Sequence, residues 1–437
     1  MSHTASELLP LTGTVAPPDS AALAGALRQA SADGTPLYPI GGGTSLDYGL
    51  PARAPGLGLS LARLDRIVDY PARDMTITVE AGIKMSVLAA ALAEQRQRLP
   101  VDVPQAERAT LGGVIATNAS GPLRYGHGTI RDYVIGISVV DGRGMEFKGG
   151  GRVVKNVAGY DFCKLLVGSL GTIGVITQAT LKVKPLPESS ALVACRLRDH
   201  EQAEQLLAGL VASRTSPTAI ELLAGPAWED EPALEPIEPA QTGSGFGQLV
   251  IALEGTAVEV QSMTATLADE WRAFGVAAHV LPPERAESLW KRLREFPAAR
   301  EGGQPHFAPK APQNEPVPNA GLVAKINVPA SRTIEMIRLA GEIQPDCSVQ
   351  AHAGNGVIVV RMPSFPSGGI SRLWIGRLQP AAQQVGGSAV ILSCSQVSEL
   401  TRQAVWGRPA QAAMLMEAVH RQFDPKNLLN PGRFVYS

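Results

Sequence analysis

Pro36-Leu-Tyr-Pro-Ile-Gly-Gly-Gly-Thr-Ser45 joins a short extended run to three consecutive glycines and two hydroxyl side chains. Successive main-chain amides in such a turn can form a nest that binds a phosphate, and the hydroxyl groups of Thr44 and Ser45 add donors. A tight turn between two strands is the simpler explanation when a triple glycine stands alone. The stretch has neither the Rossmann nor the P-loop spacing, so a nucleotide bound here would be held in a different way.

Glycine is concentrated in the first part of the chain, where 23 of the 45 glycines lie between Gly34 and Gly174. Glycine costs conformational entropy on folding and is favoured where the backbone must come close to a ligand. The second cluster, Ala109-Thr-Leu-Gly-Gly-Val-Ile-Ala-Thr-Asn-Ala-Ser-Gly121, has small side chains over most of its length. It predicts, with equal weight, either backbone that lies along a flat extended ligand or a small-residue helix packed closely on a neighbour.

Two further glycine-containing stretches lie next to apolar strands. Arg124-Tyr-Gly-His-Gly128 precedes an apolar run that ends at an Asp-Gly turn, residues 141–142. The fourth stretch runs from Lys155 to Thr177. Together with a strand at 75–80 and a helix from about Met85 to Gln97, they predict one α+β core surrounded by glycine-containing turns.

Taken in order, the four stretches resemble the FAD-binding domain of the vanillyl-alcohol oxidase and p-cresol methylhydroxylase (PCMH-type) superfamily. The resemblance spans roughly residues 20–187, and Phe423-Asp-Pro-Lys-Asn-Leu-Leu-Asn-Pro-Gly-Arg433 is similar to the superfamily's C-terminal signature. Residues 39–49, 110–128 and 154–177 are most similar to the FAD-binding subunits of bacterial glycolate oxidases.

The resemblance implies an α+β protein with three parts. These are a two-subdomain PCMH-type FAD-binding domain at residues 1–187, a ferredoxin-like α+β cap at 188–404, and a C-terminal segment at 405–437 that packs back on the FAD domain. The pattern of the cap region agrees with strands at 192–196, 219–223 and 248–253 and helices at 201–213 and 258–274. Two proline-rich stretches, 224–247 and 302–321, read as mobile loops.

The same resemblance assigns the FAD-binding residues. They are Gly41, Gly42, Gly43, Thr44 and Ser45 at the pyrophosphate, Thr110, Gly112, Gly113, Ser120 and Gly121 along the cofactor, and Gly171, Gly174 and Ile176 near its other side. Main-chain amides can hold two phosphates without Lys or Arg. No histidine or cysteine lies within 41–49, so we expect the FAD to be non-covalent. His127 is the nearest candidate for a covalent link, but a hydrogen-bonding loop histidine is the better interpretation.

Oxidation of a 2-hydroxy acid needs a cation for the carboxylate, a base for the hydroxyl proton, and the substrate carbon near flavin N5. The resemblance points to Arg294, in Trp290-Lys-Arg-Leu-Arg-Glu295, and to Lys325 as the cations. A helix-surface arginine is the simpler explanation of Arg294. A strand-edge lysine explains Lys325 equally well.

His352 lies in Ala351-His-Ala-Gly-Asn-Gly-Val-Ile-Val359, which is similar to a motif that catalytic 2-hydroxy-acid dehydrogenases use for a divalent metal and substrate. Val359 and Asn355 stand where a second histidine and an acid would be, and residues 391–395 offer no Glu-His pair. We therefore expect no metal site. His352 is interpreted as a remnant pocket residue or a core histidine, and as a candidate for catalysis.

Composition limits the function classes. The formal charge of −1 and a pI near 6.7 argue against a nucleic-acid partner. Four widely spaced cysteines exclude a local iron–sulfur site, and neither a signal peptide nor a membrane-spanning run is present, so we expect a cytoplasmic protein that meets the membrane only through partners.

The expected function is that of the FAD-binding subunit of a glycolate oxidase complex. Such a subunit acts with a partner flavin subunit and an iron–sulfur subunit to oxidise glycolate to glyoxylate. Two alternatives stay open: a self-sufficient FAD-dependent dehydrogenase of another 2-hydroxy acid such as D-lactate, and a flavin-free scaffold subunit.

Overall fold

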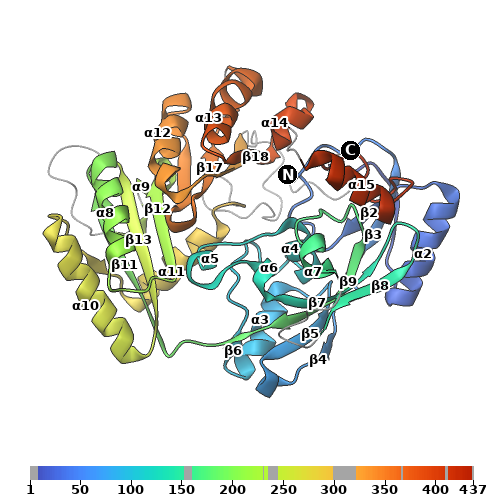
Figure 1. The fold of residues 1–437 in the computed structure, drawn as a ribbon, viewed down its shortest axis with the longest axis horizontal. Helices are drawn as coiled ribbons and strands as arrows, with labels where there is room; N and C mark the ends of the chain where they lie inside the picture. The colour runs from blue at the N-terminus through green and yellow to red at the C-terminus, as the bar shows by residue number, and fades with distance from the viewer. Residues whose placement is uncertain are drawn as a thin grey trace, which may run out of the picture. The chain divides into compact units, whose positions relative to one another are not determined.

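A computed structural model of the chain describes residues 8–151, 160–229, 231–234, 245–298, 321–365, 368–408 and 412–435. The chain divides into two compact units (Figure 1). The glycine-rich unit contains the described residues of 2–120, 128–186 and 408–437, and the large-sheet unit contains those of 121–127 and 187–407. Each unit has its own strands and helices, so the predicted α+β class is confirmed.

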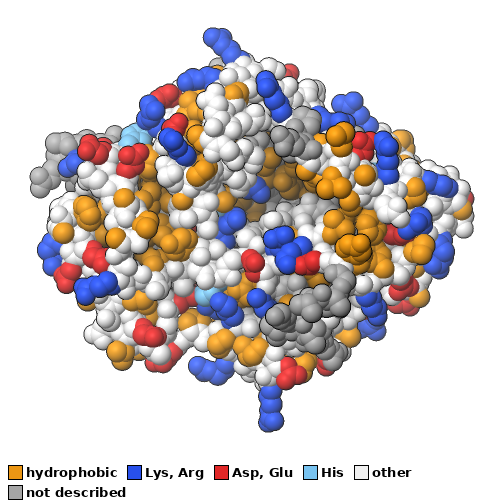
Figure 2. Space-filling model, viewed as in Figure 1, with side chains coloured by type: hydrophobic (Ala, Val, Ile, Leu, Met, Phe, Trp, Pro, Cys, Tyr) orange, Lys and Arg blue, Asp and Glu red, His pale blue; other side chains and the backbone are white. Residues whose placement is uncertain are grey.

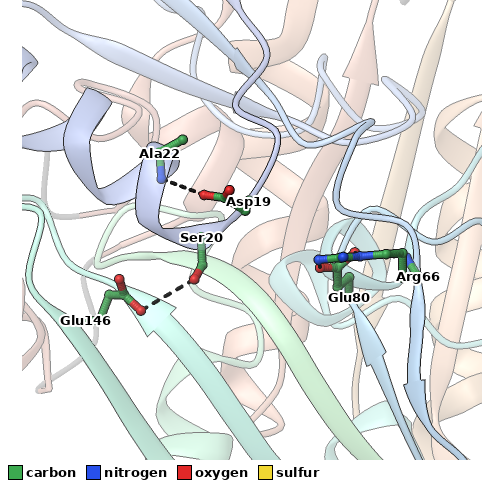
Figure 3. Close-up of polar contacts among 6 residues, drawn as sticks. All are labelled: Asp19, Ser20, Ala22, Arg66, Glu80 and Glu146. Carbon is green, nitrogen blue, oxygen red and sulfur yellow. Dashed lines mark hydrogen bonds and ion pairs between the residues drawn. The ribbon is translucent and has the colours of Figure 1, made fainter.

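The glycine-rich unit contains a small parallel sheet in the order β1-β3-β2. Its elements are β1 (Leu11–Val15), α2 (Ser20–Asp33), β2 (Leu37–Ile40) and β3 (Gly56–Ser60). Asp19 caps α2 by accepting a hydrogen bond from the Ala22 amide at 2.8 Å, and the Ser20 hydroxyl donates to Glu146 at 3.5 Å (Figure 3). The apolar face of α2 packs on the sheet through Leu23 and Leu27, which are fully buried.

The second sheet of this unit is antiparallel, in the order β4-β5-β9-β7-β8. Its strands are β4 (Ile67–Asp69), β5 (Thr76–Glu80), β7 (Val134–Val140), β8 (Glu146–Gly150) and β9 (Val175–Lys182). The helices beside it are α3 (Met85–Glu94), α4 (Leu111–Thr117), α6 (Ile130–Tyr133) and α7 (Phe162–Leu166), and α15 (Ala413–Phe423) lies near the end of the chain. The two sheets are the two subdomains that the sequence predicts.

The helix α3 ends three residues before the predicted end at Gln97. Arg96 has a positive φ of 52°, which an α-helix does not accommodate. Gln97 then pairs with Pro185 in a two-stranded sheet of β6 (Gln97–Arg98) and β10 (Lys184–Pro185). The end of the C-terminal segment also returns to this unit, because Leu429 forms a parallel bridge with Leu37 of β2.

The large-sheet unit is built on eight antiparallel strands in the order β14-β11-β13-β12-β16-β17-β15-β18. The first four are β11 (Ser189–Leu197), β12 (Ala219–Ala224), β13 (Gly247–Gly255) and β14 (His279–Val280), with α8 (His200–Ala212) and α10 (Ala257–Ala273). The others are β15 (Leu322–Asn327), β16 (Ser348–His352), β17 (Val357–Met362) and β18 (Ser388–Cys394), with α12 (Thr333–Ile343) and α13 (Gln379–Gln384).

This strand order contains the ferredoxin-like arrangement twice. In each half the first strand lies between the fourth and the third, and the second strand lies beside the third. The two halves join where their second strands, β12 and β16, pair with each other. The cap is therefore ferredoxin-like, as predicted, but it is a tandem pair in one continuous sheet.

Alternation along the strands gives the sheet two buried faces. Leu192 and Ala194 of β11 and Val250 of β13 belong to a core cluster with α11 (Pro283–Glu295), whereas the residues between them point to the opposite face. The same cluster contains Trp228, whose ring lies 4.9 Å from that of Phe296. The core cluster with α11 therefore lies on one face of the large sheet.

The prediction of a mobile loop over 224–247 is wrong for its first part. Residues 226–229 form helix α9 (Pro226–Glu229), and a 3₁₀ turn follows at Pro232–Leu234. Trp228 and Leu234 are buried because their apolar side chains fill the space beside α11. The predicted loop at 302–320, and residue 230 and residues 235–244 of the other loop, lie outside the described residues.

Positive and negative side chains are interspersed over the face shown in Figure 2, without a continuous basic stripe on that face. Within the described ranges, none of the helices combines the length and the apolar character needed to cross a bilayer.

Candidate functional site: a small-residue cleft and a polar sheet face

The glycine-rich unit contains a cleft formed by segments that are far apart in the sequence. Its lining is dominated by glycine and aliphatic residues: Pro39, Gly41, Leu61, Gly112, Gly113, Ala116, Leu170, Gly171, Gly174, Val175, Ile176 and Asn430. Six of the predicted FAD-binding residues, Gly41, Gly112, Gly113, Gly171, Gly174 and Ile176, are thus brought together.

Residues 41–45, named here the glycine loop, pack directly on the segment before α4. A Cβ added to Gly42 would overlap the main-chain carbonyl of Arg108, and one added to Gly41 would overlap the Thr110 hydroxyl. Thr110 is buried and caps α4, because its hydroxyl accepts a hydrogen bond from the Gly113 amide at 3.4 Å. Only glycine allows the two segments to come this close, which explains the residue type at 41 and 42.

Carbonyl groups of the glycine loop accept hydrogen bonds from other residues, whereas its amides remain available as donors. Arg108 donates to the Gly42 carbonyl at 3.1 Å, and the Ser45 carbonyl accepts from the Tyr48 amide at 3.2 Å. No hydrogen bond from the amides of residues 42–45 is present within the described part of the chain. Four successive unbonded amides, with the Thr44 and Ser45 side chains, have the donor chemistry that a diphosphate requires.

The opposite wall of the cleft is a turn that α4 supports. Gly168 and Leu170 donate their amides to carbonyls of α4, those of Ile115 and Ala116, each at 2.9 Å. Gly171 in this turn has a φ of 66°, a conformation that glycine adopts without strain. A wall of backbone and small side chains lets a flat ring approach closely.

Two further predicted residues, Ser120 and Gly121, do not line the cleft. The Ser120 hydroxyl is buried and has no hydrogen-bond partner among the described residues. An orphaned buried hydroxyl leaves a donor or acceptor for a ligand. Gly121 belongs to the large-sheet unit. The glycine packing, the unbonded amides and the orphaned hydroxyl all fit FAD.

Three residues at this cleft were not predicted. Arg108 holds the glycine loop, Asn430 lines the cleft, and the buried Arg433 donates to the carbonyls of Leu46 and Tyr48. Only Asn430 and Arg433 carried a sequence signal, because both lie in the C-terminal signature.

In the large-sheet unit, Lys325 and His352 lie on the same face of the sheet. Lys325 pairs with Val359 of β17, and Val359 pairs with Gln350 of β16, two residues before His352. Within the described residues, Lys325 forms no hydrogen bond or ion pair. Burial and the nearby charge of Arg124 lower the pKa of Lys325 to about 8.

His352 is buried and paired with a residue that the sequence did not point to. Its Nδ1 lies 2.7 Å from Oε1 of Glu221 on β12, and Oε2 of Glu221 accepts from the Gln350 amide group at 2.8 Å. Glu221 is fully buried. A single acidic residue inside the apolar run Ala219-Ile-Glu-Leu-Leu223 was the available signal.

The other two candidates, Arg294 and His127, lie on helices of the same unit. Arg294 lies on the last turn of α11 and forms no hydrogen bond or ion pair within the described residues. His127, on α5 (Arg124–His127), lies 2.8 Å from Glu254. In the described part of the chain, no three His, Cys, Asp or Glu side chains are grouped as metal ligands.

Comparisons with known proteins agree with the cleft. Residues 11–149 match the family described as FAD binding domain. The chain is 28% identical over 441 residues to the D-2-hydroxyglutarate dehydrogenase of Xanthomonas citri pv. viticola, covering 93% of this chain and 85% of the relative. It is 38% identical over 172 residues to glycolate oxidase subunit GlcE of Escherichia coli (strain K12), covering 39% of this chain and 49% of that protein.

The fold is shared with a solved enzyme structure. The structure of p-cresol methylhydroxylase with substrate bound superposes with a TM-score of 0.68 at 16% identity, covering 98% of this chain and 90% of that one. The two sequence relatives are named after D-2-hydroxyglutarate and glycolate, which are both 2-hydroxy acids. The p-cresol methylhydroxylase structure shares the architecture. The chain therefore contains an FAD binding domain over residues 11–149 and shares the fold of p-cresol methylhydroxylase.

Proposed function

We propose that this chain is the FAD-carrying subunit of a glycolate oxidase complex, which oxidises glycolate to glyoxylate together with a partner flavin subunit and an iron–sulfur subunit. The observation that carries the proposal is a contrast between the two units. The glycine loop keeps its unbonded amides, whereas the described residues at His352 offer only its imidazole and the Glu221 carboxylate as metal ligands. The 38% identity to glycolate oxidase subunit GlcE supports the same role.

The need for partners follows from the electron chemistry. FAD, when bound, accepts the hydride that leaves the substrate carbon. The four cysteines, Cys163, Cys195, Cys347 and Cys394, are free thiols, so an iron–sulfur centre would lie in another chain. Free thiols also support the cytoplasm as the proposed location, with membrane contact only through partners.

The chain's own residues would hold the cofactor as a non-covalent ligand. The amides of Gly42, Gly43, Thr44 and Ser45 would donate to the diphosphate, and Thr110, Gly112, Gly113 and Ser120 would follow its length. Gly171, Gly174 and Ile176 would form the far wall. Denaturation should release free FAD into the supernatant; flavin that stays with the precipitated chain would contradict the non-covalent mode.

Co-purification from the native host tests the proposed complex. The expected result is a yellow chain that elutes with two companions, one flavin-containing and one with an iron–sulfur absorbance. The chain alone should oxidise glycolate far more slowly than the assembled complex. Equal rates for both would remove the accessory role and leave the oxidoreductase class intact.

A second candidate function is a self-sufficient dehydrogenase of another 2-hydroxy acid such as D-lactate, and the sheet face of the large-sheet unit favours it. Lys325, which has no ion pair among the described residues, would bind the substrate carboxylate, as would Arg294. With Nδ1 of His352 donating to Glu221, Nε2 is left to accept the hydroxyl proton. The match to an FAD binding domain speaks against the third possibility, a flavin-free scaffold.

Flavin bleaching by substrate separates the two candidates. In the self-sufficient enzyme, Lys325→Ala and Arg294→Ala should each slow bleaching by D-lactate or glycolate at least tenfold, because a carboxylate loses a charged partner. Arg285→Ala, an exposed position on the same helix, is the matched control. Unchanged bleaching in both variants rejects the second candidate.

A further inference from the structure

The C-terminal segment of residues 424–433, named here the C-terminal strap, runs beside β2 just before the glycine loop. Leu37 of β2 donates its amide to the Leu428 carbonyl at 2.7 Å, and Asn430 donates its amide to the Leu37 carbonyl at 2.9 Å. Leu429 is fully buried in the same core cluster as Leu37 and Leu59. The strap is therefore part of the small-sheet subdomain.

The strap is also fastened to the five-stranded subdomain. The residue before it, Phe423, accepts a hydrogen bond from the Gly142 amide at 3.0 Å. The side chain of Asp424 is buried and accepts from the Leu429 amide at 2.7 Å, which fixes the turn. The side chain of Asn430 donates to the Leu170 carbonyl at 2.7 Å, directly before Gly171 in the cleft wall. One short segment thus bonds to both walls of the FAD cleft.

Arg433 connects the strap to the glycine loop itself. The residue is 6% exposed, and one Nη2 atom donates to the Leu46 and Tyr48 carbonyls, the second at 2.7 Å. The Leu50 amide returns a hydrogen bond to the Arg433 carbonyl at 3.0 Å. Together with Arg108 on Gly42, these bonds turn the carbonyls of the loop toward arginine and leave the amides of 42–45 for another ligand.

We propose that the C-terminal strap is a positioning element for FAD, in which Arg433 sets the conformation of the diphosphate-binding loop before the cofactor arrives. Preorganised donors do not have to be ordered during binding, so affinity rises without any contact between Arg433 and FAD. Binding and strap docking must then be linked, because a ligand favours the conformation that binds it better. The inference rests on FAD binding by the cleft and holds for an accessory subunit and for a self-sufficient enzyme alike.

Affinity measurements on the full-length apo-protein test the role of Arg433. Arg433→Met should weaken FAD binding about tenfold or more, the equivalent of one charge-assisted hydrogen bond. ADP, which carries the diphosphate and no flavin ring, should lose affinity by the same factor. Arg433→Lys should recover part of the loss, because an ammonium can reach one carbonyl but cannot form the planar fork. The control is Arg421→Met, an exposed residue on α15.

The ligand series distinguishes positioning from a general structural defect. Unchanged FAD affinity in folded Arg433→Met overturns the proposal, and so does a loss for FAD with unchanged ADP affinity. Where Arg433→Met does not fold, Arg433→Lys and hydrogen exchange on the wild-type chain decide. Exchange of the Leu37, Leu50 and Asn430 amides should slow when ADP is added, and equal exchange with and without ADP contradicts the coupling.

Discussion

Lys325 occupies a position that costs the folded chain free energy. Burial and Arg124 lower the pKa of Lys325 to about 8, so the folded state binds its proton less tightly than the unfolded state does. Stability should therefore rise with pH between about 8 and 10.5, where the unfolded chain holds a proton that the folded chain has released. Below that window the partly buried Lys325 is charged in the folded and the unfolded chain, and the full cost of that charge is present.

Replacing this residue should stabilise the protein at neutral pH. Lys325→Met keeps the apolar stem and removes the charge, and we expect the free energy of unfolding at pH 7 to rise by about 1–3 kcal/mol. The gain should shrink as the pH passes from 8 to 10.5. Urea unfolding followed by tryptophan fluorescence measures both, with the exposed Lys291→Met as control. A variant no more stable than the wild type at pH 7 would contradict a destabilising charge at Lys325.

The shifted pKa of Glu80 stabilises the folded chain, whereas that of Lys325 destabilises it. Burial alone would raise its pKa, but hydrogen bonds from the Arg66 guanidinium at 2.7 and 3.1 Å and from the Arg66 amide at 2.9 Å outweigh burial and lower it (Figure 3). A depressed pKa contributes stability above the unfolded value, and the contribution is lost as the pH falls through the folded value.

Glu80→Gln should therefore destabilise the glycine-rich unit by about 1 kcal/mol at pH 7, a modest figure because Arg66 is largely exposed. The difference from the wild type should shrink below about pH 4. Far-UV circular dichroism during urea unfolding at pH 7 and pH 3.5 measures it. A constant difference across this range would show that the carboxylate charge has no part in it.

At the scale of elements, sequence patterns predicted local structure better than strand partners. The pattern of the cap region predicted strands at 192–196, 219–223 and 248–253, which the structure has as β11, β12 and β13. The pairing of β12 with β16 joins residues 131 positions apart, and no local pattern encodes it. For that reason Glu221 was missed although His352 was found, and the second ferredoxin-like half was not anticipated.

The β12–β16 junction carries a buried ionisable pair, so its two members should not be equivalent in mutagenesis. His352→Ala leaves the carboxylate of Glu221 buried with Gln350 alone, and we expect a loss of about 3–5 kcal/mol. Glu221→Gln keeps an acceptor without the charge and should cost about 1–2 kcal/mol. The double variant should cost less than the sum, because the two residues interact directly. Urea unfolding at pH 7 followed by tryptophan fluorescence checks all three, and additive losses would contradict the pair.

At the scale of the whole molecule, the two units have separate cores, and the cofactor cleft lies in one of them. The cofactor cleft is made by residues of the glycine-rich unit. All five tryptophans, Trp228, Trp271, Trp290, Trp374 and Trp406, belong to the large-sheet unit. Tryptophan fluorescence therefore reports unfolding of one unit, and the flavin reports the other.

This division predicts that FAD stabilises the units unequally. A ligand that binds only the folded state adds about 2.7 kcal/mol at a hundredfold excess over its dissociation constant. That free energy belongs to the unit that contains the cleft, so the thermal midpoint of flavin release and of the corresponding calorimetric transition should rise with FAD concentration. The midpoint seen by tryptophan fluorescence should stay within about one degree, since its unit gains no ligand. A tryptophan midpoint that rises in step with FAD would mean that the two cores unfold as one cooperative unit.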